Sequence, residues 1–141
     1  MRCAIGADDA GPLTDALLAD LERRGADVVR FGALLDGSTR WAHIGRAVAA
    51  TVAAGDAEVG IVCCWTGTGI SIAANKVPGA RAALCGDAVT AEGARRWNDA
   101  NVLALSLRAT SPAVGIEILD AFLRTPASEA PSDRREIAAL E

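Results

Sequence analysis

Short apolar runs alternate with helix-like segments five times along this chain of 141 residues, and this alternation constrains the fold more than any other feature. Each run is short and apolar, which is typical of a buried strand. Strands that alternate with helices form a parallel sheet with helices on both faces. We therefore expect an α/β fold with a five-stranded parallel sheet, whose strands cover residues 2–7, 27–31, 59–64, 81–85 and 102–106.

Helix signals occupy the segments between the expected strands. In "GPLTDALLADLERRG" (11–25), leucines recur at helical spacing between Pro12 and Gly25. A chain of this length fits a single domain, residues 1–141, with an ordinary apolar core. Further helices are expected near 42–54, at about 69–76, from Asp87 as N-cap through 96, from Ser111 onward and over 134–141.

Charge and hydropathy exclude several classes of protein. The formal net charge is −4, and no basic patch is dense enough for a nucleic-acid interface. No apolar run approaches the length of a membrane span, and the run near the N-terminus is too short for a signal peptide. We expect a cytoplasmic protein that binds neither nucleic acid nor membrane.

The four cysteines are Cys3, Cys63, Cys64 and Cys85. They form no CxxC pair and no metal-ligand spacing with His43, the only histidine. Three of them, all except Cys64, lie inside apolar segments, where a thiol usually behaves as a small hydrophobic group. Neither a zinc site nor a disulfide framework is expected.

The stretch "CCWTGTG" (63–69) combines thiols with a glycine turn at the expected end of a strand. Successive strand residues face opposite sides, so Cys63 and Cys64 lie in different environments. Ligands of such folds bind beyond the carboxyl ends of the strands, where Cys64 can face them. Gly67 and Gly69 allow a sharp turn whose N–H groups can point at an anion, and the same helix end favours a thiolate. The alternative is a tight turn around a buried thiol.

The longer context "CWTGTGISIAANKVPGARAALCGDAVTAEGARRWNDANVLAL" resembles the ribose-5-phosphate isomerase B family, which also includes the galactose-6-phosphate isomerase subunits. The most specific part is "SIAANKVPGARAALC", while "IGADDAG" and the arginines at 134–135 extend the similarity over nearly the whole chain. The resemblance implies a Rossmann-like three-layer α/β/α sandwich. It also implies a homodimer, or a tetramer of paired dimers, with an active site at a subunit interface and no cofactor.

The resemblance further implies the chemistry of an aldose–ketose isomerase. Such an enzyme moves a proton between neighbouring carbons through an enediolate, and it needs a carbon base and donors for the oxyanion. The family's cysteine base aligns with Cys64, its assisting hydroxyl with Thr66, and its backbone donors with the Gly67–Gly69 turn. Other members use a glutamate where this chain has Ile70, so the resemblance places this chain in the cysteine type.

The substrate contacts implied by the resemblance include several departures from the family pattern. Asp9 stands where the family has a histidine, and Trp97 replaces the histidine credited with opening a furanose ring; an indole cannot shuttle a proton. Pro131 replaces a family arginine. The expected substrate-binding residues are Asp8, Asp9, Trp41, Gly67, Thr68, Gly69, Trp97, Asn98, Arg108 and Arg135.

Several of these residues also have a purely structural interpretation. Asp8 and Asp9 can cap the following helix instead of contacting a ligand. Trp41, Trp65 and Trp97 are all expected in loops of the site, where Trp65 replaces a family glycine. The three indoles either pack against the substrate or fill a subunit interface.

Two classes of function are compatible with the retained and the replaced residues. The retained Cys64 and Thr66 favour an isomerase of a sugar phosphate or related polyol, with a specificity altered from ribose 5-phosphate. The two lost histidines and the lost arginine favour a non-catalytic relative that binds a sugar phosphate or serves a structural role. His43 is expected at the surface, and the alternative is that it replaces the missing proton shuttle. The tail, residues 125–141, is expected to pack on the partner subunit or to close the site.

Overall fold

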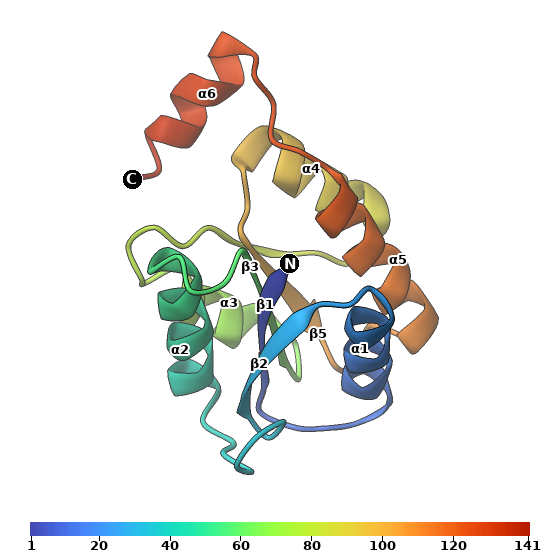
Figure 1. Ribbon diagram of the computed structural model, residues 1–141. Coiled ribbons are helices and arrows are strands. Elements are labelled where there is room, and N and C mark those ends of the chain that lie inside the picture. The colour runs from blue at the N-terminus through green and yellow to red at the C-terminus, as the bar shows by residue number, and fades with distance from the viewer.

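The computed structural model describes residues 1–141 as five strands and six helices (Figure 1). Every predicted strand and helix is present, with small shifts in its bounds. No helix combines the length and apolar character needed to span a membrane. In chain order the elements are β1 (Arg2–Ala7), α1 (Pro12–Arg23), β2 (Asp27–Gly32), α2 (Trp41–Ala53), β3 (Val59–Cys64), α3 (Thr68–Ala74), β4 (Ala82–Leu84), α4 (Ala88–Asn98), β5 (Val102–Ser106), α5 (Pro112–Arg124) and α6 (Pro131–Ala138).

All five strands run parallel in one sheet, in the order β2-β1-β3-β5-β4, which confirms the predicted α/β architecture. The central β3 is buried along its whole length, as expected for the unbroken run VGIVCC in a strand covered on both faces. From β1 the chain leaves toward β2 on one side, and from β3 it leaves toward β4 on the other. Ligands of such sheets bind where these connections diverge, here above the carboxyl ends of β1 and β3.

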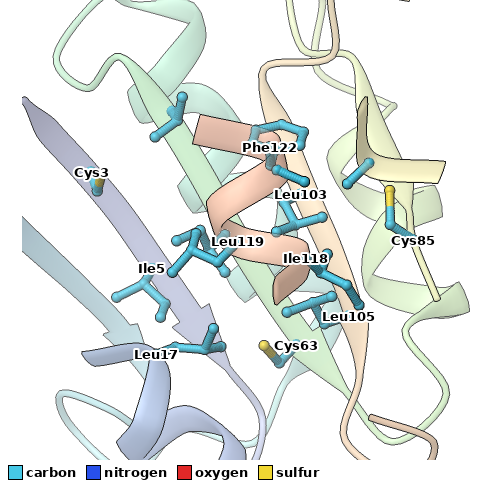
Figure 2. Packing of buried hydrophobic residues seen from close by; sticks show 14 of the residues in the cluster. Cys3, Ile5, Leu17, Cys63, Cys85, Leu103, Leu105, Ile118, Leu119 and Phe122 are labelled. Atoms are coloured by element: carbon cyan, nitrogen blue, oxygen red, sulfur yellow. The ribbon is translucent and has the colours of Figure 1, made fainter. Parts of the chain in front are cut away.

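Helices cover both faces of the sheet (Figure 1). One face packs against α1, α4 and α5, and its core contains Cys63 together with Ile61 and Phe122 (Figure 2). The other face packs against α2 and α3, and its core contains Cys64 and Val62. The two neighbouring cysteines therefore point to opposite sides of the sheet, as strand geometry predicts. Full burial of a side chain such as Phe122 contributes about 1.5–3 kcal/mol to stability.

Side-chain caps set the starts of α4 and α5. The carboxylate of Asp87 accepts a hydrogen bond from the N–H of Thr90 at 2.7 Å, which confirms the predicted cap. The hydroxyl of Ser111 accepts one from the N–H of Val114 at 3.2 Å. Each cap satisfies an N–H that has no partner within its helix, and such caps contribute about 1 kcal/mol.

Two asparagines, one in SIAANKVPGARAALC and one in the following NDAN (98–101), hold loops together. The Asn75 side chain donates to the carbonyl of Ala82 at 2.9 Å and accepts from its N–H at 2.8 Å. The Asn101 side chain accepts from the N–H of Arg81 at 2.8 Å and donates to the carbonyl of Gly79 at 2.9 Å. Both motifs therefore shape the chain around β4, and part of their specificity reflects the fold rather than the chemistry.

The prediction that all three tryptophans lie in loops is wrong for two of them. Trp41 is the first residue of α2, and Trp97 lies in the last turn of α4. The helix α4 continues to Asn98 because the chain reverses only at Asp99, whose φ of 45° is left-handed. Only Trp65, directly after β3, lies in a loop.

The C-terminal tail lies at the end of the sheet opposite to the carboxyl ends of β1 and β3 (Figure 1). Helix α6 buries none of its residues. Leu140 lines a hollow with Asn75 and Arg81, and Arg81 forms an ion pair with Glu141 at 2.5 Å. Because Arg81 immediately precedes β4, these contacts place the tail near the amino ends of the strands, where it does not cover Cys64 of its own chain.

Candidate active site

A cavity of about 340 Å³ opens above the carboxyl ends of β1 and β3, and we call it the Cys64 cavity. Its walls come from these two strand ends, from the start of α2 and from the turn that opens α3. The structure thus brings together the predicted base, the assisting hydroxyl and several predicted contacts within one chain. The lining residues are Asp8, Trp41, Cys64, Trp65, Thr66, Thr68 and Gly69.

Cys64 lines this cavity, although only 5 % of its surface is exposed. Its carbonyl oxygen accepts hydrogen bonds from the N–H groups of Gly67 at 3.2 Å and Leu107 at 2.9 Å, which fix the main chain that carries the thiol. The neighbouring Cys63 lies in the core on the other face, where burial raises the pKa of its thiol to about 12. Of these two thiols, only Cys64 is placed to react with a ligand.

The turn after Cys64 requires glycine at position 67. Gly67 has a φ of 76°, a left-handed conformation that other residues rarely adopt. A Cβ atom there would lie 2.5 Å from Cδ1 of Leu84 and 2.9 Å from the backbone of Leu105. The side chain of any other residue at this position would displace the turn from the end of β5.

The turn carries free donors next to the thiol. The N–H of Gly67 is engaged by the carbonyl of Cys64, so it does not belong to the anion donors that the sequence suggested. The N–H groups of residues 68–70 belong to the first turn of α3 and have no backbone partner. The hydroxyls of Thr66 and Thr68 share a hydrogen bond of 2.7 Å. Amide and hydroxyl donors therefore lie within one turn of Cys64.

Asp8 contributes an unsatisfied carboxylate to the Cys64 cavity. Its Oδ1 atom is buried and has no hydrogen-bond partner. Burial raises the pKa of Asp8, a backbone hydrogen bond opposes this shift, and the charge of Asp9 adds to it. Helix α1 is capped without it, because the N–H of Gly11 donates to the hydroxyl of Thr14 at 2.9 Å. Buried polar atoms nearly always have a partner, so this oxygen favours a ligand that donates a hydrogen bond.

Two indoles line the Cys64 cavity. Trp41 packs against Gly69, where an added Cβ would lie 3.1 Å from the ring. Trp65 is 64 % exposed, and its carbonyl accepts hydrogen bonds of 2.9 Å from the hydroxyl of Ser106 and from the N–H of Arg108. Trp65 was expected in a loop of the site, but it is not among the ten substrate-binding residues expected from the sequence. Two features of the sequence could have identified Trp65 as a residue of the cavity: its position next to Cys64, and the family glycine that it replaces.

A second hollow, of about 370 Å³, adjoins the first and contains Arg108. Thr66 lines both the Cys64 cavity and this hollow, which also includes Cys85, Ser106 and Thr110. Arg108 is exposed and supplies a positive charge to this second hollow. A ligand extending past Thr66 can thus reach both the thiol and a cation.

The remaining predicted contacts do not line the Cys64 cavity of their own chain. Asp9 lies in a separate hollow on the other side of Trp65, while Trp97 and Asn98 line a hollow of about 550 Å³ along α4. Arg135 is exposed on α6. His43 is exposed on α2 and is likewise outside the cavity, as its surface interpretation predicted. No three His, Cys, Asp or Glu side chains are grouped to hold a metal ion.

Comparisons with known proteins agree with the observed fold. A profile of the family described as Ribose/Galactose Isomerase matches residues 3–140. Ribose-5-phosphate isomerase B of Escherichia coli is 39 % identical over 123 residues, 86 % of this chain and 83 % of that protein. The galactose-6-phosphate isomerase subunit LacB of Clostridium acetobutylicum is 38 % identical over 87 % of this chain and 72 % of its own length. The structure of type B ribose 5-phosphate isomerase from Trypanosoma brucei superposes with a TM-score of 0.89 at 40 % identity, covering 99 % of this chain and 95 % of that one.

Proposed function

This chain belongs to the ribose/galactose isomerase family, and we propose that it interconverts an aldose phosphate and its ketose through an enediolate, with Cys64 as the carbon base. The relatives from Escherichia coli and Clostridium acetobutylicum are isomerases of sugar phosphates. The observation that supports the proposal most is the cavity in which Cys64, Thr66 and the unpaired oxygen of Asp8 meet. A thiol, a hydroxyl and an acceptor within one cavity match the needs of this reaction.

In the proposed reaction, the Cys64 thiolate removes the proton from the carbon next to the substrate carbonyl. The electron pair of the broken C–H bond forms the enediolate double bond, and the carbonyl oxygen takes the negative charge. The N–H groups of residues 68–70 donate to this oxygen, and one such donor is typically worth about 3 kcal/mol. The Thr66 hydroxyl passes a proton between the two oxygens, and the Cys64 thiol returns its proton to the neighbouring carbon. Proton transfer by placed groups accelerates such steps by roughly 100- to 10,000-fold.

The same cavity supports an orientation for the substrate. A substrate hydroxyl donates to Oδ1 of Asp8, which otherwise lacks a partner. The chain of the sugar passes Thr66, and its phosphate lies near Arg108 in the adjoining hollow. Arginine pairs well with phosphate because its planar guanidinium donates two parallel hydrogen bonds.

We further propose a specificity altered from ribose 5-phosphate. Trp97 stands where the family histidine opens a furanose ring, and an indole N–H donates a hydrogen bond but cannot relay a proton. The enzyme should therefore prefer a substrate that is open-chain or does not cyclise readily. Asp9 and Pro131, in place of a histidine and an arginine, also reduce the positive charge available to a phosphate.

The proposed active unit is a homodimer, which can pair into a tetramer. Trp97, Asn98 and Arg135 do not line the Cys64 cavity of their own chain, so their proposed contacts require a partner. Helix α6 buries no residue against its own chain, which supports its packing on another subunit. Light scattering at micromolar concentration tests this assembly, and a monomer would contradict it.

A panel of aldose phosphates with four to six carbons tests the proposed activity. We expect conversion to the ketose with the highest kcat/KM on substrates that stay open-chain. The replacements at Asp9, Trp97 and Pro131 favour the second candidate, a non-catalytic relative that binds a sugar phosphate. Binding of the panel without any turnover would support that candidate and contradict the isomerase.

A further inference from the structure

Thr66 and Thr68 form the one pair of side-chain hydroxyls in this protein that are hydrogen-bonded to each other. Their Oγ1 atoms lie 2.7 Å apart, and either atom can be the donor. Both residues line the Cys64 cavity, and neither hydroxyl has another partner within the chain. The reaction proposed for this cavity uses the hydroxyl of Thr66 and leaves that of Thr68 without a role.

A hydrogen bond between two hydroxyls can run in either direction, and this distinguishes the pair from other bonded threonines of the chain. The hydroxyls of Thr51 and Thr125 donate to main-chain carbonyl groups, which can only accept. A hydroxyl carries one hydrogen and can accept two hydrogen bonds. One hydrogen of the Thr66–Thr68 pair lies between the two oxygens, so the other is free for a ligand. The direction of the shared bond decides which of the two residues offers it.

The backbone holds the two hydroxyls at this spacing. Gly67, which lies between them, has a φ of 76°, and its N–H donates to the carbonyl of Cys64 at 3.2 Å. A Cβ atom on Gly67 would lie 2.5 Å from Cδ1 of Leu84, so the turn is closely packed. Threonine is also stiff at χ1 because it is β-branched. The pair is therefore positioned before a ligand binds, as proton transfer requires.

We infer that Thr68 is a second proton-transfer residue, which acts with Thr66 as a two-hydroxyl relay between the oxygens of the substrate. This inference rests on the proposed function, because the relay starts from the enediolate that Cys64 forms. The two oxygens of a cis-enediolate stand on neighbouring carbons and are separated by about the length of one hydrogen bond, as are the two threonine oxygens. Each substrate oxygen can thus face one threonine hydroxyl.

The relay moves one proton and leaves both threonines neutral. The substrate hydroxyl, on the carbon that has lost its hydrogen, gives its proton to Oγ1 of Thr68. Thr68 gives its own proton to Oγ1 of Thr66, and Thr66 gives its own to the former carbonyl oxygen, which carries the negative charge. Each threonine oxygen loses one O–H bond and gains another, and the charge passes to the oxygen that becomes the ketose carbonyl. The shared hydrogen bond then points the other way, so the reverse reaction uses the same three transfers.

Deuterium uptake separates the relay from the removal of the carbon proton. In heavy water the Cys64 thiol exchanges its proton, so an enediolate that waits for the relay returns to the aldose with deuterium on carbon. Thr68→Val keeps the shape of the side chain and removes the hydroxyl. Its kcat should fall by roughly 10- to 100-fold, the lower part of the range for positioned proton-transfer groups, because Thr66 remains. The ratio of deuterium in recovered aldose to ketose formed should rise by about tenfold.

Three further variants complete the test. Thr68→Ser keeps the hydroxyl and should have a kcat and a deuterium ratio close to those of the wild type. Thr68→Ala removes the hydroxyl with a smaller side chain and should raise the ratio as Thr68→Val does. Thr51→Val is the matched control, because it also removes a bonded hydroxyl but lies on α2 and lines none of the hollows. It should leave the ratio unchanged.

The same assays distinguish a failure of the relay from a failure of the proposed function. A hydroxyl that only braces the turn would lower exchange and conversion together, so an unchanged ratio in Thr68→Val and Thr68→Ala overturns the inference, whatever the fall in kcat. The isomerase with Cys64 as base would then still stand. If the wild type neither exchanges nor converts any aldose phosphate of the panel, the isomerase itself is contradicted, and the relay with it.

Discussion

The indole of Trp41 packs directly against Gly69, so that a Cβ atom added to Gly69 would lie 3.1 Å from Cζ3 and 3.3 Å from Cη2 of the ring. Trp41 begins α2 and Gly69 lies in the first turn of α3, so the contact joins the two helices on one face of the sheet. Trp41 is 45 % exposed, which leaves its ring room to shift. Gly69 thereby sets the position of the ring beside the Cys64 cavity.

The two glycines of the turn should respond differently to substitution. Gly69→Ala should displace the Trp41 ring by a few tenths of an ångström and lower kcat/KM by less than about 100-fold, the loss associated with a 1 Å misplacement. Its effect on the free energy of unfolding should stay within about 0.5 kcal/mol. Gly67→Ala should cost at least about 1–2 kcal/mol of stability, because its φ of 76° is left-handed and the added Cβ would also lie 2.9 Å from the backbone of Leu105. Thermal melts and steady-state kinetics measure both effects, and equal losses of stability would contradict this assignment.

The Asp8→Asn variant should lose activity and gain stability. A hydrogen bond to a charged acceptor contributes about 1.5–3 kcal/mol, so kcat/KM should fall by roughly 10- to 100-fold. Stability should rise at neutral pH because the variant removes the charge of a half-buried carboxylate whose buried Oδ1 atom has no partner. Kinetics and melting temperatures at pH 7 measure the two opposite effects.

The raised pKa of Asp8 determines how the difference in stability between the wild type and Asp8→Asn changes with pH. Burial raises the pKa of Asp8, so the folded protein holds this proton to a higher pH than the unfolded chain does. The wild type therefore loses stability as the pH rises through that raised pKa, and the Asp8→Asn variant does not. The difference in melting temperature should vanish below about pH 3, where Asp8 is protonated in both states. A difference that grows on acidification would contradict burial of the Asp8 carboxylate as the cause.

The sequence predicts the strands well because each is a short apolar run, and it predicts that Cys63 and Cys64 face opposite sides because strand periodicity is local. The helical position of Trp97 was missed, since it depends on where the left-handed Asp99 reverses the chain. The separation of Asp8 from Asp9 could not be predicted either. It is created by the indole of Trp65, which comes from a distant strand end and lines the spaces on both sides.

A shared active site makes a specific prediction for mixtures of variants. Cys64→Ala and Asn98→Ala should each be nearly inactive alone if Asn98 acts in the cavity of the partner subunit. After unfolding and refolding together in equal amounts, half of the dimers carry one variant of each kind, and one of their two sites has both wild-type residues. By two-fold symmetry, about a quarter of wild-type activity should return. No recovery, with heterodimers demonstrated by mass spectrometry, would place Asn98 in its own chain's site or outside any site.

Restoring a proton shuttle should change the preferred form of substrate. Trp97→His introduces an imidazole that titrates near neutral pH at the position of the family histidine. Ribose 5-phosphate turnover should rise, by up to the roughly 100- to 10,000-fold that general acid–base catalysis supplies. Turnover of an open-chain tetrose phosphate should change little. Coupled assays on both substrates test this prediction. If the wild type already converts ribose 5-phosphate as fast as the open-chain substrate, the proposed altered specificity is contradicted.

Alkylation should single out Cys64 among the four thiols. Burial raises the pKa values of Cys3 and Cys85 to about 11 and that of Cys63 to about 12, so these thiols stay protonated near neutral pH. Cys64 is the thiol that lines the cavity of the proposed site. Mass spectrometry after brief iodoacetamide treatment should show Cys64 labelled first, and a bound aldonic acid phosphate should protect it.

The chemical step itself depends on Cys64 in the proposed mechanism. Cys64→Ala should abolish isomerisation while preserving the fold and ligand binding, because the proposed oxyanion donors are backbone N–H groups of residues 68–70. Cys63→Ala is the matched control, since its side chain packs on the opposite face; it should cost about 1 kcal/mol of stability and leave the chemistry intact. Isomerisation in heavy water provides the most direct measurement, through deuterium uptake at the carbon next to the carbonyl. Uptake should continue in Cys63→Ala and stop in Cys64→Ala. Full exchange in Cys64→Ala would mean that another group is the base and that the thiol only fills the end of β3.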